Sequence, residues 1–177
     1  MDPRVLRTKR DYHNAMIELL KTVPLEQMTV KQLCDKAGIS RTTFYEHYSV
    51  PQDCFYEVVD EYLEELKMRL EALPVKDMHY CMLEYLKLMK EHRYVFREVH
   101  RTTVNNPVFM DIAKLLLHYI ALPKLGDDLP EGEFEKILKY QFYGFFGLTS
   151  EWLERGCKET PEQQVHVLDT MMDLLLS

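Results

Sequence analysis

The chain has few of the residues that interrupt or loosen a fold. Its 177 residues include only six glycines and eight prolines, fewer than disordered or fibrous chains contain. No apolar run approaches the roughly 20 residues needed to cross a bilayer. The first residues, MDPRVLRTKRDYHN, contain no apolar segment resembling a signal peptide. These absences predict a protein that is folded throughout and cytoplasmic.

Cysteine is also scarce, and its spacing argues against the common cysteine chemistries. The four cysteines are widely separated, with no C-x-x-C pair, and no two histidines stand at metal-ligand spacing. We therefore expect reduced, buried thiols and no metal site. The sequence further lacks a phosphate-binding glycine loop, an H-E-x-x-H segment and a G-x-S-x-G segment. It predicts neither an enzyme nor a cofactor, although scattered catalytic residues would leave no such pattern.

Negative charge predominates, but it is unevenly distributed. The formal net charge is −7. Residues 1–50 carry eight Lys or Arg against six Asp or Glu, whereas residues 51–177 carry 14 against 23. The N-terminal part can therefore approach phosphate groups that the remainder repels. Chance variation among solvated faces is the alternative explanation.

Apolar residues recur at helical spacing along nearly the whole chain, which predicts an all-α fold. Glycine, proline and capping residues separate the helical segments, and the composition of residues 123–132 indicates a loop. The expected helices cover about residues 4–21, 29–37, 40–48, 51–73, 77–92, 94–100, 105–121, 133–155 and 161–176.

Residues 29–48 show the pattern of a helix-turn-helix, which places its second helix in the DNA major groove. Thr29 and Gln32 form a capping box at the start of the first helix, and Gly38 supplies the turn. Arg41 and Thr42 then face away from the core together with Tyr45, where they can meet base edges. The other candidate DNA contacts, which suit phosphate, are Thr29, Thr43 and His47.

The segment RTKRDYHNAMIELLKTVPLEQMTVKQLCDKAGISRTTFYEHY, residues 7–48, resembles the DNA-binding region of the TetR family of bacterial transcriptional regulators. The resemblance implies a DNA-binding domain over residues 1–50 and a ligand-binding and dimerisation domain over residues 51–177. It also adds one residue to the expected DNA contacts, which become Thr29, Ser40, Arg41, Thr42, Thr43, Tyr45 and His47. A purely structural role, as a cap or a packing residue, remains open for Thr29, Ser40 and Tyr45.

One position departs from the family pattern. The family usually has a lysine at the start of the fourth helix, where it meets a phosphate, but this chain reads SVPQDC over residues 49–54. Pro51 occupies about that place and supplies neither a charge nor a backbone N–H. We therefore expect one phosphate contact to be missing.

The helix over about residues 134–156 is apolar on more than one face and so requires partners on two sides. One side suits the core, and the other suits a second copy packed with the helix over residues 165–176. The TetR resemblance implies a four-helix dimer interface here, and closure of a monomeric core is the alternative. The candidate interface residues are Tyr140, Tyr143, Gly144, Gly147, Leu168 and Met172.

Methionines and aromatic residues in the middle helices can line a pocket for a small apolar effector. Plain core packing fits their spacing equally well. The candidate ligand residues are Met82, Tyr85, Met89, Phe96, Phe109 and Tyr119. The sequence thus predicts a ligand-responsive homodimeric repressor that binds double-stranded operator DNA, or alternatively a TetR-like coactivator controlled by a protein partner.

Overall fold

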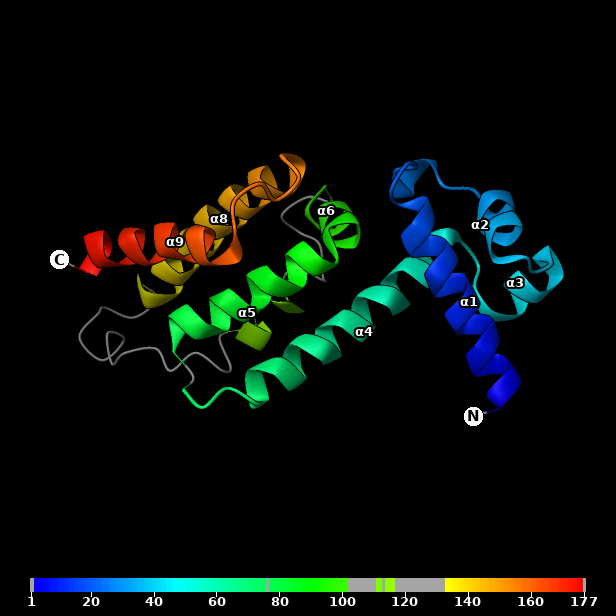
Figure 1. Cartoon of the computed structure of the whole chain (residues 1–177), viewed down its shortest axis with the longest axis horizontal. Helices are drawn as coiled ribbons and strands as arrows, with labels where there is room; N and C mark the ends of the chain where they lie inside the picture. Colours follow the sequence, from blue (N-terminus) through cyan, green and yellow to red (C-terminus); the bar gives the residue numbers. More distant parts are fainter. Residues whose placement is uncertain (1, 76, 102–110, 113, 117–132, 177) are drawn as a thin grey trace. The chain divides into compact units, whose positions relative to one another are not determined.

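The computed structural model describes residues 2–75, 77–101, 111–112, 114–116 and 133–176, and within these residues it contains helices and no strand (Figure 1). The expected all-α fold is confirmed. The chain forms two compact units, Met1–Leu63 and Glu64–Ser177. The division between them falls inside helix α4 (Pro51–Glu71), whereas the sequence suggested a boundary at the start of that helix.

The N-terminal unit contains α1 (Pro3–Leu19), a short 3-10 turn η1 (Leu25–Gln27), α2 (Val30–Ala37), α3 (Arg41–His47) and the first part of α4. Local capping sets the boundaries of α2 and α3. Thr29 and Gln32 form the expected reciprocal box at the start of α2. Gly38, with φ of 69°, ends the helix in the left-handed region that favours glycine. Ser40 then caps α3.

An aromatic cluster holds α1, α3 and the residue after α3 together. The rings of Tyr12 and Phe44 meet edge to face with centroids 5.6 Å apart, and Tyr12 meets Tyr48 at 5.8 Å in the same manner. All three side chains are buried. Edge-to-face pairs add to the gain from burial because the positive ring edge meets the negative ring face. Helix α3 is therefore held in place by packing against α1.

The second unit contains α5 (Met78–Glu91), α6 (Arg93–Arg101), α8 (Glu133–Glu154) and α9 (Pro161–Leu176). Helix α5 packs against α9, and α6 packs against α8. Trp152 is buried near the end of α8, and its indole N–H donates to the carbonyl of Glu159 at 3.2 Å. This contact fixes the short connection between α8 and α9.

The helix expected over residues 105–121 lies mostly outside the described residues, and residues 111–112 and 114–116 within it are helical. The loop expected over residues 123–132 also lies outside them. The remaining expected helices are present with ends that differ by a few residues. Among the described helices, none has both the length and the apolar character of a membrane span.

Candidate DNA-binding interface

Helix α3 presents a polar surface on a firmly seated backbone. Phe44 is fully buried beneath it, while Arg41, Thr42 and Tyr45 are exposed, with Tyr45 at 61%. The hydroxyl of Tyr12 on α1 lies 3.3 Å from the carbonyl oxygen of Ser40 and donates to it. A helix face that is exposed, polar and held from behind suits insertion into a groove.

Three of the other expected DNA contacts already use their hydroxyl groups within the protein. The Thr29 hydroxyl donates to Gln32 Oε1 at 2.7 Å and accepts from the Gln32 backbone N–H at 3.2 Å. The Ser40 hydroxyl accepts from the Thr43 backbone N–H at 3.2 Å and lies 3.1 Å from the Thr43 hydroxyl. Capping is thus an observed role of Thr29 and Ser40.

His47 is half-buried at the end of α3, with its ring 6.2 Å from that of Tyr48. The arrangement brings Ser40, Arg41, Thr42, Thr43 and Tyr45 together on α3, with Thr29 at the start of α2.

Several cations of this unit are available to phosphate groups. In contrast, Lys9, Lys21 and Lys31 each pair with a carboxylate, at 2.6, 2.5 and 2.7 Å. The exposed basic side chains that form no ion pair with a described residue are Arg4, Arg10, Lys36 and Arg41. Among these four, spacing along the sequence predicts only Arg41, because spacing alone does not show which cations have carboxylate partners.

The start of α4 is acidic. Pro51 is buried at the first position of the helix. The carboxylate of Asp53 accepts from the backbone N–H groups of Ser49 at 2.7 Å and Val50 at 3.0 Å. The helix terminus that the family resemblance associates with a phosphate contact therefore already holds an anion.

In the second unit, the expected effector residues that the structure describes lie in the core. Met82, Tyr85, Met89 and Phe96 are buried. The ring of Tyr85 lies 5.9 Å from that of Phe96 and 5.8 Å from that of Phe145. Phe109 and Tyr119 lie outside the described residues. These contacts show that the described candidates lie together. Their arrangement fits both a pocket lining and ordinary core packing.

Among these four buried side chains, Tyr85 carries the one hydroxyl group. Only 2% of this residue is exposed. Burial raises the pKa of this phenol above its usual value, so it remains a donor at neutral pH.

A further polar group, which the sequence pattern does not single out, is the half-buried His100 on α6. Its ring stacks on Phe146 with centroids 4.3 Å apart, and its Nδ1 lies 2.9 Å from the Ser150 hydroxyl. Burial lowers the pKa of His100 to about 3. The imidazole is therefore neutral at physiological pH and forms part of the α6–α8 contact.

The expected dimer residues on α8 form an open surface. Tyr140 is 71% exposed and Tyr143 is 45% exposed. A side chain added at Gly144 or Gly147 would meet no neighbouring atom within 4 Å. On α9, Leu168 is half-buried, and the side chain of Met172 lies outside the described part of the chain.

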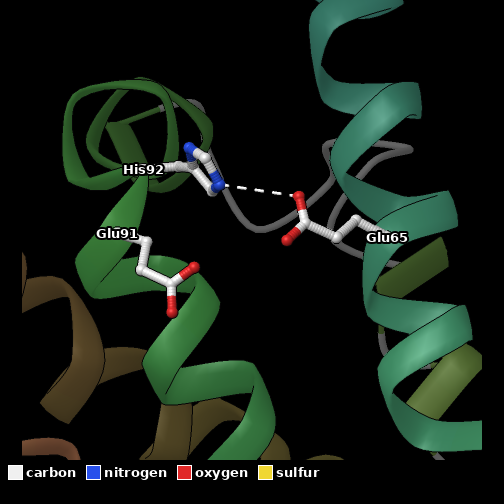
Figure 2. Close-up of side chains that lie close together, drawn as sticks. All are labelled: Glu65, Glu91 and His92. Atoms are coloured by element: carbon white, nitrogen blue, oxygen red, sulfur yellow. Dashed lines mark ion pairs between the residues drawn. The ribbon is translucent and has the colours of Figure 1, made fainter. Parts of the chain in front are cut away.

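Glu65 on α4 and two neighbours at the end of α5, Glu91 and His92, offer ligand atoms within 4.8 Å of one another (Figure 2). His92 Nε2 lies 3.6 Å from Glu65 Oε2. Arg69 donates to both carboxylates, at 2.5 Å in each case. Its guanidinium lowers the pKa of Glu91. A metal ion would have to displace this cation, so the group is better described as a salt-bridge cluster with its own counter-charge.

Comparison with known proteins supports the assignment suggested by the N-terminal motif. A TetR-family model described as "Transcriptional regulator C-terminal region" matches residues 75–174. No curated protein sequence matches significantly.

Solved structures of similar fold include a TetR transcriptional regulator from Streptococcus agalactiae, 23% identical over 96% of each chain, with a TM-score of 0.65. The fatty acid degradation regulator FadR from Bacillus halodurans is 13% identical over 97% of this chain and 95% of its own, with a TM-score of 0.67. The dihydroxyacetone kinase operon activator DhaS is 17% identical over 95% of each chain, with a TM-score of 0.65. With a family model covering more than half of its length, the chain belongs to the TetR family of transcriptional regulators.

Proposed function

We propose that this protein is a homodimeric repressor that binds operator DNA through α3 and releases it when a small, mainly apolar molecule enters the second unit. The observation that carries the proposal is the exposed face of α3, where Arg41, Thr42 and Tyr45 project from a backbone fixed by Tyr12. Arg41 forms no ion pair with a described residue, so its guanidinium is available for a guanine.

The proposed contacts divide into two kinds. Arg41, Thr42 and Tyr45 read base edges or thymine methyl groups, whereas Lys36 and Arg10 neutralise phosphates. Thr29, Ser40, Thr43 and His47 complete the predicted contact set. The hydroxyls of the first three contribute only by extending or exchanging the hydrogen bonds that they already form.

Dimerisation is proposed through α8 and α9. Two large tyrosines stand exposed on α8 beside glycines that leave the helix surface open, and Val167 and Met171 are exposed on α9. Exposed aromatic and apolar side chains on adjoining helices are typical of a four-helix interface. A pair of α3 helices related by a two-fold axis then meets half-sites about one DNA turn apart.

Effector binding is proposed around Tyr85, which carries the one hydroxyl among the buried ligand candidates. A ligand with an apolar body and one hydrogen-bonding group would bond to this hydroxyl and pack against Met82, Met89 and Phe96. Two proteins of similar fold are named as regulators of fatty acid degradation and of fatty acid metabolism. A fatty acid has both an apolar body and a hydrogen-bonding group. Binding shifts the separation of the two α3 helices, which lowers affinity for a two-fold site.

The alternative is a coactivator controlled by a protein partner. The close ring contacts of Tyr85 with Phe96 and Phe145 favour it, because a filled core has no room for a ligand. One protein of similar fold, DhaS, is named as an operon activator. In this alternative, DNA occupancy is insensitive to small apolar molecules and responds to a co-purifying protein.

Selection of random duplexes against the purified protein at two salt concentrations tests the DNA-binding proposal. An enriched palindrome whose binding is weakened by Arg41→Ala and by Tyr45→Ala is expected. Recovery of no palindrome, or binding indifferent to both variants, contradicts the proposal. Titration of the selected duplex complex with saturated fatty acids then separates the ligand-responsive form from the partner-controlled form.

A further inference from the structure

A buried histidine in the N-terminal unit lies between two carboxylates. His13 on α1 is 6% exposed. Its Nδ1 lies 3.0 Å from Glu61 Oε1, and its Nε2 lies 3.2 Å from Glu57 Oε2. Both acids are on the first part of α4, within the unit Met1–Leu63. The histidine therefore joins α1 to α4 through both of its ring nitrogens.

Hydrogen-bond counting indicates which form of the ring satisfies this geometry. A neutral imidazole has one N–H and can donate to only one carboxylate, whereas an imidazolium donates from both nitrogens. Loss of the proton leaves a ring lone pair facing one carboxylate. Glu61 is the partner that separates first, because 63% of its side chain is exposed and it can turn to water.

Glu57 stays ionised in this cluster. Burial opposes its ionisation, but hydrogen bonds from Lys9, Tyr48 and His13 outweigh burial and lower its pKa. Lys9 donates to Glu57 at 2.6 Å, and the Tyr48 hydroxyl donates at 2.8 Å. Cys54, beside Tyr48, adds no charge because burial raises the pKa of its thiol to about 12. Proton loss from His13 thus leaves Lys9, on Glu57, as the one cation paired with either carboxylate among the described residues.

The same segment of α1 contacts both ends of the recognition helix. Tyr12 donates to the carbonyl of Ser40, which caps the start of α3. Next to it, His13 Nε2 lies 3.3 Å from the hydroxyl of Tyr48, the residue that ends α3. A change in the hydrogen bonds of His13 therefore reaches the backbone position from which Arg41 and Tyr45 project.

We propose that His13 is a positioning residue that makes DNA binding depend on pH, with its protonated ring locking α1 and the end of α3 onto Glu57 and Glu61. This inference rests on the proposed DNA-binding function. Affinity is highest where His13 is protonated and falls as pH rises through its deprotonation. Because Glu61 is exposed, we expect a modest fall, roughly three- to tenfold from the acid to the alkaline end of the measured range at constant salt.

The test compares wild type with His13→Gln, which keeps one side-chain donor but cannot titrate. Affinity for the selected duplex is measured at several pH values in one salt concentration, with His166→Gln, at an exposed position on α9 outside the N-terminal unit, as the control for loss of a histidine. Wild type and the control should share the pH slope, and His13→Gln should lose it. Nitrogen chemical shifts of the His13 ring, followed over the same range, report its protonation directly.

Equal pH slopes in wild type and His13→Gln overturn the inference while leaving the proposed DNA-binding function intact. If wild type binds the duplex at no pH, both this inference and the proposed DNA-binding function are overturned. This result is distinct from equal pH slopes, which require that wild type binds. If His13→Gln fails to fold, Glu61→Gln serves instead, since its side chain is exposed. That variant should show a shallower slope, and an unchanged slope counts against the inference.

Discussion

The carboxylate of Asp53 accepts a hydrogen bond from the backbone N–H of Ser49 at 2.7 Å. This contact fills the start of α4 with a negative charge, just where Pro51 stands in place of the lysine expected from the family resemblance. The candidate DNA interface therefore differs from the family pattern in charge, and the effect of this difference on DNA affinity can be measured.

Introducing the lysine should restore a phosphate contact. We expect Pro51→Lys to raise duplex affinity roughly three- to tenfold near 0.1 M salt and to steepen the salt dependence by about one unit of log K against log salt. Pro51→Ala removes the same ring without adding charge and serves as the control. Fluorescence anisotropy across a salt series measures both quantities, and equal slopes for the two variants would contradict the expectation.

Arg41 and Lys36 should give different losses. Arg41→Ala should cost about 1–3 kcal/mol at one base position and relax the preference there, whereas Lys36→Ala should weaken all sequences alike and reduce the salt slope. Repeating duplex selection with each variant shows which positions of the site lose their preference. A uniform loss with Arg41→Ala would place this side chain on the phosphate backbone instead.

Tyr143 should be required for dimerisation. Placing a charge at its position buries an unpaired carboxylate in the proposed interface, so Tyr143→Glu should weaken self-association on the order of 100-fold. Tyr80→Glu is the matched control, because Tyr80 is also 45% exposed but lies on α5. Sedimentation velocity at micromolar concentration separates one-chain from two-chain species. Dissociation by both variants, or by neither, would argue against the α8 interface.

His100 should limit stability in acid. Its folded-state pKa of about 3 lies below the ordinary value of 6.5. As pH falls below about 6.5, the unfolded chain therefore binds a proton that the folded chain does not bind. The free energy of unfolding then declines until about pH 3. We expect this group to account for about 3 kcal/mol between pH 7 and pH 4.

The measurement is denaturant unfolding at several pH values for wild type and His100→Gln. The variant should lose some stability at pH 7, where it disturbs the Phe146 stack, yet show a shallower decline in acid. His166→Gln, at an exposed position on α9, is the control and should follow wild type. If the free energy of unfolding declined equally in acid for all three proteins, protonation of His100 would not destabilise the fold.

Local features of the fold were predictable because their partners are close in sequence. Thr29 and Gln32, the turn at Gly38 and the cap at Ser40 all act over three or four residues, and each appears where the sequence indicated it. The all-α architecture follows from the same kind of local information. The assignment of Thr29 and Ser40 to caps was open from sequence and is settled by geometry, while their contact with DNA stays a prediction.

Contacts between distant residues were not predictable from spacing. Tyr12 reaches Ser40 across 28 residues, and His13 reaches Glu57 across 44. No periodicity distinguishes His13 from any other polar residue near an apolar helix face. The pairing of Lys9 with Glu57 likewise removes a cation that the sequence offers to DNA. Choosing among such groups requires knowledge of which carboxylates lie opposite them.

The hydroxyl pairs of Thr29 with Gln32 and of Ser40 with Thr43 bear on how much sequence this protein can recognise. On the proposed assignment of contacts, they leave Arg41, Thr42 and Tyr45 as the exposed side chains of α3 that would read base edges. If each of these side chains specifies about one base pair, two half-sites together carry on the order of 12 bits of sequence information. Selecting one site among ~10⁶ requires about 20 bits. We expect the missing information to lie in the spacing between half-sites and in the shape of the DNA that joins them.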